Sequence, residues 1–104
     1  MPLAPRYALQ IAPIAETQID AALLWWDQNR ATPLLAREIE AALAQLAFVP
    51  RSGRRVRLRG HPSARRLLLQ RTAYHLYYVV DDDERNVDIV YFRHARRRPL
   101  RGQT

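Results

Sequence analysis

The chain has 104 residues, of which 48% are hydrophobic, enough for one packed core and too many for a disordered tail. It contains no cysteine, which excludes a disulfide framework, a thiolate metal site and a cysteine nucleophile. The net charge is +7, and every basic residue apart from histidine is arginine, a side chain suited to bidentate contact with phosphate or carboxylate.

The charge is distributed unevenly along the chain. Residues 1–50 carry three arginines against five acidic residues, a net −2, whereas residues 51–104 carry fourteen arginines against five acidic residues, a net +9. Eight arginines and no acidic residue occur from Arg51 to Val80. The basic half of the chain is suited to bind an anionic partner, either nucleic acid or acidic protein. An equally good interpretation is that its arginines are solvated surface charges with no partner.

Residues 6–12 alternate apolar and polar side chains and predict a short strand, with Tyr7, Leu9 and Ile11 on one side. Pro13 then suits the first position of a helix, because its missing N–H group would have no partner there. The helix is predicted to extend to about Arg30. Its apolar residues at i, i+3, i+4 and i+7 are Ile19, Ala22, Leu23 and Trp26.

Thr32 and Pro33 predict the start of a second helix, as a cap and a first helical residue respectively. This helix is expected to end near Ala47, and its apolar face comprises Leu35, Ile39, Leu43 and Leu46. The short link between the two helices predicts an antiparallel helical hairpin.

The basic connector that follows contains several breakers and one brief strand, predicted at Val56–Arg59. Three further strands are predicted at about 65–71, 74–80 and 87–94, joined by a tight turn near Thr72 and by an acidic turn, and these strands should form an antiparallel meander. On the middle strand, one face carries Leu76, Tyr78 and Val80, and the other carries His75, Tyr77 and Val79. On the last strand, Val87, Ile89 and Tyr91 oppose Asp88, Val90 and Phe92.

Both faces of the predicted meander are apolar, so one can pack against the helices and the other needs a partner or a ligand. The order of elements predicts an α+β fold, β-α-α-β-β-β, with both helices packed on one side of the sheet. We expect a single domain over residues 1–104 with a flexible tail from about Pro99. No apolar run approaches the roughly 20 residues of a membrane span, and we expect a cytoplasmic protein without a membrane partner.

Four segments together resemble one known family in their order and spacing. They are AETQIDAALLWW (15–26), LAREIEAALAQL (35–46), RRLLLQRTAYHLYYVV (65–80) and VDIVYFRHARRRP (87–99). These segments resemble the RelE/ParE superfamily of bacterial toxins, over nearly the whole chain from Tyr7 to Pro99.

The resemblance implies a toxin encoded beside an antitoxin, with no cofactor. The cognate antitoxin is expected to be a ribbon-helix-helix protein whose acidic C-terminal segment wraps the toxin, and operator DNA is expected to be bound through the antitoxin. The resemblance also implies one of two activities. ParE-like members inhibit DNA gyrase, and RelE-like members cut mRNA in the ribosome. The helical hairpin with Trp25 and Trp26, together with the YHLYYVV strand, favours the ParE-like branch.

The RelE-like alternative is a metal-free reaction in which the RNA 2′-OH attacks its own phosphate. By the resemblance, Arg66 would bind phosphate, and His94 and Arg97 would stand where some relatives carry catalytic residues. Tyr78 and Tyr91 are candidates for stacking a base. The chain lacks the lysine, and its basic connector lacks the glutamate, that often serve this catalysis, so the base would be His61, His75 or His94. A structural role is the alternative for each histidine, and their spacing predicts no metal site.

Under the favoured ParE-like function no residue is catalytic, and the important residues bind partners. One of the two adjacent tryptophans should lie in the core and the other at a protein interface. The residues predicted to bind partners are Trp25, Trp26, Arg55, Arg57, Arg65, Arg66, Arg96 and Arg97.

Overall fold

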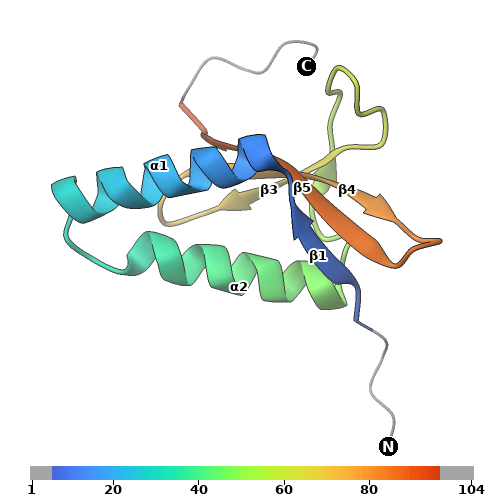
Figure 1. Ribbon diagram of the computed structural model, residues 1–104, viewed down its shortest axis with the longest axis horizontal. Helices are drawn as coiled ribbons and strands as arrows, with labels where there is room; N and C mark the ends of the chain where they lie inside the picture. The colour runs from blue at the N-terminus through green and yellow to red at the C-terminus, as the bar shows by residue number, and fades with distance from the viewer. Residues whose placement is uncertain (1–5, 97–104) are drawn as a thin grey trace, which may run out of the picture.

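The computed structural model describes residues 6–96, which form one sheet and two helices (Figure 1). The predicted order of a strand, two helices and then further strands is confirmed. The predicted tail from about Pro99 and the candidate residue Arg97 lie outside the described residues. The elements are β1 (Ala8–Ile11), α1 (Pro13–Asn29), α2 (Leu34–Phe48), β2 (Arg54–Arg55), β3 (Arg65–Leu69), β4 (Tyr74–Asp81) and β5 (Asn86–His94).

The sheet has the strand order β1-β5-β4-β3-β2. Strands β3, β4 and β5 form the predicted antiparallel meander. Strand β1 lies at one edge of the sheet and pairs with β5 in parallel, with Leu9 opposite Val87. The helical hairpin forms the crossover that leads from β1 to β2 at the opposite edge. This arrangement places the N-terminal strand beside the last strand.

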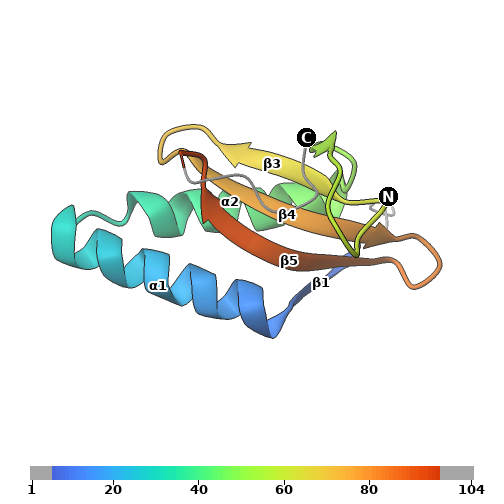
Figure 2. The same cartoon turned by 90° about the horizontal axis from the view of Figure 1, so that it is seen from above.

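Both helices pack on the same face of the sheet, as predicted, and run antiparallel to each other (Figure 2). The predicted apolar faces supply Ile19 and Ala22 from α1 and Leu35, Ile39 and Leu46 from α2 to the buried core. Helix α2 begins one residue later than predicted, because Pro33 is its N-cap and not its first helical residue. Thr32 precedes the cap, and its hydroxyl accepts a hydrogen bond from the Leu34 N–H group at 3.0 Å.

The predicted alternation of side chains on β5 is wrong beyond Ile89. Tyr77 pairs with Tyr91 and Tyr78 pairs with Ile89, so Val90 is an extra residue that forms a β-bulge. Because the bulge reverses the alternation, Tyr91 packs on the face away from the helices. Phe92 returns to the helix face and lies in the main core.

The face of the sheet away from the helices is here called the outer face. The connector covers part of it, because Leu58 and Ala64 pack there against Tyr77 and Val90 in a second hydrophobic cluster. The prediction that this face needs a partner or ligand is therefore wrong for the covered part. The brief strand predicted at Val56–Arg59 is also wrong, since the pairing stops at Arg55 and the following residues fold over the sheet instead of extending it.

Tyr78 joins the sheet to the start of the connector. Its side chain is fully buried, and its hydroxyl accepts a hydrogen bond from the Gly53 N–H group at 2.8 Å. Burial raises the pKa of Tyr78 above its ordinary value, so the hydroxyl stays neutral. A Cβ atom at Gly53 would lie 2.7 Å from this hydroxyl and 2.8 Å from the Arg66 carbonyl oxygen, a spacing that only glycine allows.

We expect Tyr78→Phe to lower the free energy of unfolding by about 1–3 kcal/mol, because the buried Gly53 N–H group loses its acceptor. Urea denaturation of the purified chain measures this loss. The control is Tyr91→Phe at a partly exposed position on β5, where we expect a change within about 0.5 kcal/mol. Equal losses in the two variants would contradict the prediction.

Candidate functional site

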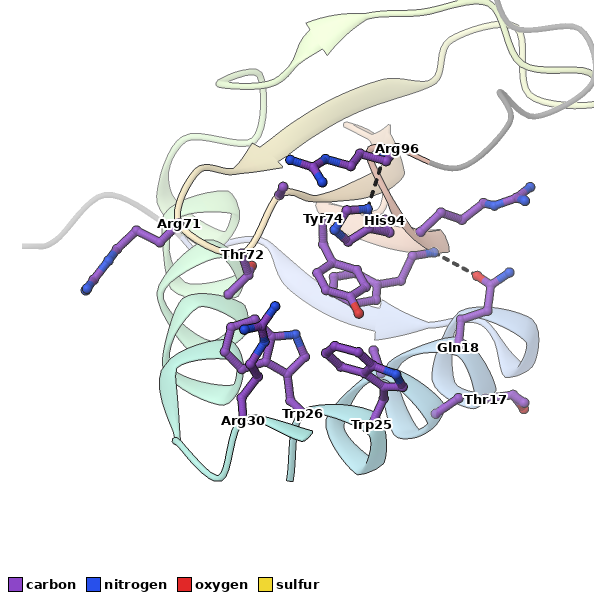
Figure 3. Close-up of a pocket in the computed structure, with 15 residues that line it drawn as sticks. Thr17, Gln18, Trp25, Trp26, Arg30, Arg71, Thr72, Tyr74, His94 and Arg96 are labelled. Atoms are coloured by element: carbon purple, nitrogen blue, oxygen red, sulfur yellow. Dashed lines mark hydrogen bonds between the residues drawn. The ribbon is translucent and has the colours of Figure 1, made fainter. Parts of the chain in front are cut away.

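A pocket of about 990 Å³ lies between α1 and the end of the sheet where β4 begins and β5 ends (Figure 3). It is called here the α1 groove. Its lining includes four arginines and no acidic residue. The lining residues are Thr17, Gln18, Ala21, Ala22, Trp25, Trp26, Arg30, Arg71, Thr72, Ala73, Tyr74, Phe92, Arg93, His94 and Arg96.

The helical wall of the groove contains both tryptophans of the chain. The prediction that one of them packs in the core is confirmed for Trp26, while Trp25 remains 46% exposed. The two rings meet edge to face, with their centroids 6.5 Å apart. The Arg30 guanidinium carbon lies 5.7 Å from the Trp25 ring centroid and 5.8 Å from that of Trp26, so a cation sits over the indole pair.

The sheet wall of the groove is also aromatic. Tyr74 stacks on Phe92 with the ring centroids 4.9 Å apart, and His94 meets Tyr74 edge to face at 5.0 Å. The Arg96 N–H group donates a hydrogen bond to His94 Nδ1 at 3.1 Å, so His94 has the structural contact expected of a strand-end histidine. On the opposite wall, Gln18 Oε1 accepts a hydrogen bond from the Phe92 N–H group at 2.8 Å (Figure 3).

Glu38 of α2 holds the turn that forms one end of the groove. Its carboxylate accepts hydrogen bonds from the Arg71 N–H group at 3.1 Å, the Thr72 N–H group at 2.9 Å and the Thr72 hydroxyl at 2.7 Å. Thr72 is buried. Sequence analysis missed this role. The sequence held one indication of this role. Glu38 is three positions after Leu35, so it lies at the margin of the apolar face of α2, where a carboxylate can reach a partner in the chain.

A second basic surface lies on the outer face of the sheet. Arg66 is opposite Tyr77 on β4, and His75 is opposite Arg93 on β5, so the three basic residues are neighbours across three strands. We call Arg66, His75 and Arg93 the outer-face cluster. The pKa of His75 is lowered from its ordinary value, first by burial and then by the positive charge of Arg66. Within the described residues, the buried Arg93 Nε has no hydrogen-bond partner.

Two arginines of the basic half instead bind within the chain. Arg65 donates a hydrogen bond to the Gly53 carbonyl oxygen at 2.8 Å. Arg51 pairs with Asp82 in the turn after β4, and this hydrogen bond lowers the pKa of the Asp82 carboxyl below its ordinary value. These contacts shape the connector, so neither guanidinium is as available to a partner as the exposed Arg55 and Arg57.

The structure does not bring the ribonuclease candidates together. Arg66 lies on the outer face, His94 lies in the α1 groove, and Tyr78 is buried in the core between these two surfaces. The fully buried Tyr78 ring presents no face on which a base could stack. Among the residues predicted to bind partners, Trp25, Trp26 and Arg96 do meet, in the groove.

Within residues 6–96, no three histidine or acidic side chains are grouped closely enough to hold a metal ion. Neither helix in this part of the chain is long and apolar enough to cross a membrane.

The fold is found in solved structures of toxins from toxin–antitoxin systems. The chromosomal ParDE system from P. aeruginosa gives a TM-score of 0.65 at 17% identity, covering 88% of this chain and 98% of that chain. The intact E. coli RelBE complex gives 0.64 at 20% identity, with 88% and 99% covered. The RelBE2 complex from Mycobacterium tuberculosis gives 0.61 at 24% identity, with 86% and 98% covered. At these identities, the likeness establishes the α+β toxin fold.

The family itself follows from the sequence match. The family described as ParE toxin of type II toxin-antitoxin system, parDE, matches residues 9–99. The chain belongs to this family and so to the RelE/ParE superfamily of type II toxins, which confirms the resemblance found in the sequence. Comparison with curated protein sequences gave no match.

We expect Glu38→Ala to lower the free energy of unfolding by about 1–3 kcal/mol, because two donors of Thr72 lose their acceptor. Thermal and urea denaturation measure the loss, and hydrogen exchange should show faster opening at the Thr72 amide. Glu40→Ala removes an exposed carboxylate from the same helix and should change stability by less than about 0.5 kcal/mol. A Glu38→Ala variant as stable as Glu40→Ala would disprove the role of Glu38.

Proposed function

We propose that this chain is a toxin that inhibits DNA gyrase in the cytoplasm and is neutralised by a cognate antitoxin. The observation that carries the proposal is the match to the ParE toxin family over residues 9–99. The P. aeruginosa ParDE and E. coli RelBE structures contain a toxin–antitoxin system and a toxin–antitoxin complex respectively, which supports an antitoxin partner here.

The distribution of side chains agrees with inhibition by binding. An inhibitor needs a complementary surface and no acid–base pair, and the ribonuclease candidates Arg66, His94 and Tyr78 lie in three different places. Exposed arginines such as Arg55 and Arg57 suit contact with acidic protein or with gyrase-bound DNA. We propose that operator DNA is contacted through the antitoxin, expected to be a ribbon-helix-helix protein, as the resemblance to RelE/ParE toxins implies.

The outer-face cluster favours a second candidate function, cleavage of mRNA in the ribosome. His75 has a lowered pKa and is therefore neutral at pH 7, the form that takes the proton of an RNA 2′-OH group. The 2′ oxygen would bond to phosphorus as the bond to the 5′ oxygen breaks, giving a 2′,3′-cyclic phosphate and a 5′-hydroxyl whose proton comes from water. Arg66 and Arg93 would stabilise the charge on the phosphate oxygens. Of the three histidines that the sequence offers as a base, this function would use His75 and not His61 or His94.

The favoured function predicts that the purified chain blocks ATP-dependent supercoiling of relaxed plasmid by purified gyrase, or makes cleaved DNA accumulate. The effect should weaken as salt is raised, because arginine contacts with an anionic surface are screened. Relaxation of the same plasmid by a type I topoisomerase is the control and should be unaffected. A chain that leaves gyrase active at large molar excess refutes the proposal.

The second candidate function predicts mRNA cleavage on programmed ribosomes, mapped by primer extension. His75→Ala should then reduce the rate by about 10²–10⁴-fold through loss of the base, and Arg66→Ala should also reduce it. Because the pKa of folded His75 lies below 6.5, the ordinary histidine value, the rate should fall only as the pH drops below 6.5. His61→Ala in the connector is the control. If the unaltered chain cuts no mRNA, this candidate is eliminated.

A further inference from the structure

The two edges of the sheet differ in how well they are protected against pairing with another chain. Strand β2, at one edge, is two residues long and consists of Arg54 and Arg55. Short and charged edge strands resist pairing. Strand β1, at the other edge, has the sequence ALQI and carries no charge. Ala8, Gln10 and Ile11 are exposed, so β1 is the edge that is available to a further strand.

The backbone of β1 presents hydrogen-bonding groups on its free side. The N–H groups of Ala8 and Ala12 donate hydrogen bonds on the side of β5, at 2.9 and 2.8 Å. Because backbone groups alternate in direction along a strand, the N–H and C=O groups of Leu9 and Ile11 point away from β5. Within residues 6–96, no strand pairs with this side of β1. Each copy of the chain therefore offers a donor and an acceptor at both residues.

Large exposed hydrophobic side chains lie at both ends of this edge. At the start of β1, the Tyr7 N–H group donates a hydrogen bond to the last turn of α2 at 2.9 Å, and the neighbouring Phe48 and Val49 are exposed. At the other end, where α1 begins, Ile11 is exposed and Ile14 is 57% exposed (Figure 1). An uncharged strand edge with apolar side chains at both ends is typical of a protein interface.

The edge is complementary to a second copy of itself. If two β1 strands pair antiparallel about a twofold axis at Gln10, Leu9 of each copy faces Ile11 of the other. These two residues are the ones whose N–H and C=O groups point outward, and each facing pair exchanges two hydrogen bonds. Gln10 then faces Gln10 of the second copy on the axis. This register leaves no outward backbone group of Leu9 or Ile11 unpaired.

The two ends of the edge also match in apolar character and in charge. Antiparallel pairing brings Phe48 and Val49 of one copy to the end at which the other copy exposes Ile14. Arg6 lies at the same end as Phe48, with its guanidinium carbon 4.5 Å from the ring centroid. The opposite end carries Glu16 in the first turn of α1, so each arginine approaches a carboxylate of the other copy. Parallel pairing would instead place the two Arg6 side chains at the same end.

We propose that β1 is a dimerisation edge, at which two copies of this chain join their sheets by antiparallel pairing of β1 centred on Gln10. The two sheets then form one continuous sheet with both helical hairpins on its outside. Because β1 has only four residues, we expect a buried area near the lower end of the roughly 1,200–2,000 Å² of stable interfaces, and a dissociation constant of about 1–100 µM. The pairing requires neither gyrase nor an antitoxin.

Sedimentation equilibrium of the full chain at about 1–200 µM should show a monomer–dimer equilibrium. Gln10→Cys tests the register, because the chain contains no other cysteine. In this register the two Gln10 Cα atoms should be about 4.5 Å apart, a separation that a disulfide spans. Mild oxidation should therefore give a covalent dimer. Gln28→Cys, at an exposed position of α1, is the control and should cross-link at least about tenfold more slowly.

A charge on the edge should prevent the pairing. Ile11→Lys places an ammonium group opposite Leu9 of the second copy and should weaken the dimer at least about tenfold. Leu24→Lys makes a matched change at an exposed position farther along α1 and should alter the dissociation constant by less than about twofold. Circular dichroism confirms that both variants are folded.

Hydrogen exchange locates the interface in the unaltered chain. The Leu9 and Ile11 amides should exchange more slowly as the protein concentration rises, because dimerisation gives them acceptors. The Gln10 amide is directed at β5 and should exchange at the same rate at every concentration.

Four results would overturn the dimerisation edge. They are a chain that stays monomeric at about 200 µM, equal cross-linking of the two cysteine variants, equal dimerisation of Ile11→Lys and Leu24→Lys, and protection of the Leu9 and Ile11 amides only after a different protein is added. The last result would assign the edge to that protein. The gyrase assay is scored separately. A monomeric chain that inhibits gyrase loses the dimer and keeps the proposed function, and a dimeric chain that leaves gyrase active does the reverse.

Discussion

The carboxylate of Glu38 is the contact on which the groove depends. It accepts three hydrogen bonds from the turn between β3 and β4. These hydrogen bonds attach α2 to this end of the sheet. That turn leads directly into Tyr74, which forms the sheet wall of the groove. Because donors at Thr72 are buried, the turn loses hydrogen bonds if it moves away from α2. The position of the groove relative to the helical hairpin is therefore set by polar contacts as well as by the hydrophobic core.

The two faces of the sheet carry the same sign of charge in different arrangements. On the helix side, arginines flank an aliphatic and aromatic groove. On the outer face, Arg66, His75 and Arg93 lie beside one another in the strand register, next to a hydrophobic cluster covered by the connector. The first arrangement suits an amphipathic acidic peptide and the second suits a phosphate. The two surfaces adjoin at Arg93, which lines the groove and also belongs to the outer-face cluster.

Sequence patterns predicted most of the fold and part of the site. Helical spacing identified the core faces of both helices, and alternation identified the meander and the two faces of β4. The errors arose where one residue changed the geometry. The bulge at Val90 exchanges the faces of Tyr91 and Phe92. Strict alternation of side chains assumes that every residue pairs with the neighbouring strand, so it does not predict an extra residue. In the site, Trp25, Trp26 and Arg96 meet, whereas Arg66 and His94 are on separate surfaces.

The sequence by itself determined the family, the order of elements, the composition of the core and the basic character of the second half. Local spacing and composition suffice for these, because helix and strand periods depend on neighbouring residues. Tertiary structure alone decided which arginines are exposed and which bind within the chain, that Leu58 covers part of the outer face, and that Glu38 closes the turn beside the groove. These contacts join residues far apart in the chain, and their partners depend on strand register and on the path of the connector, which no local pattern encodes.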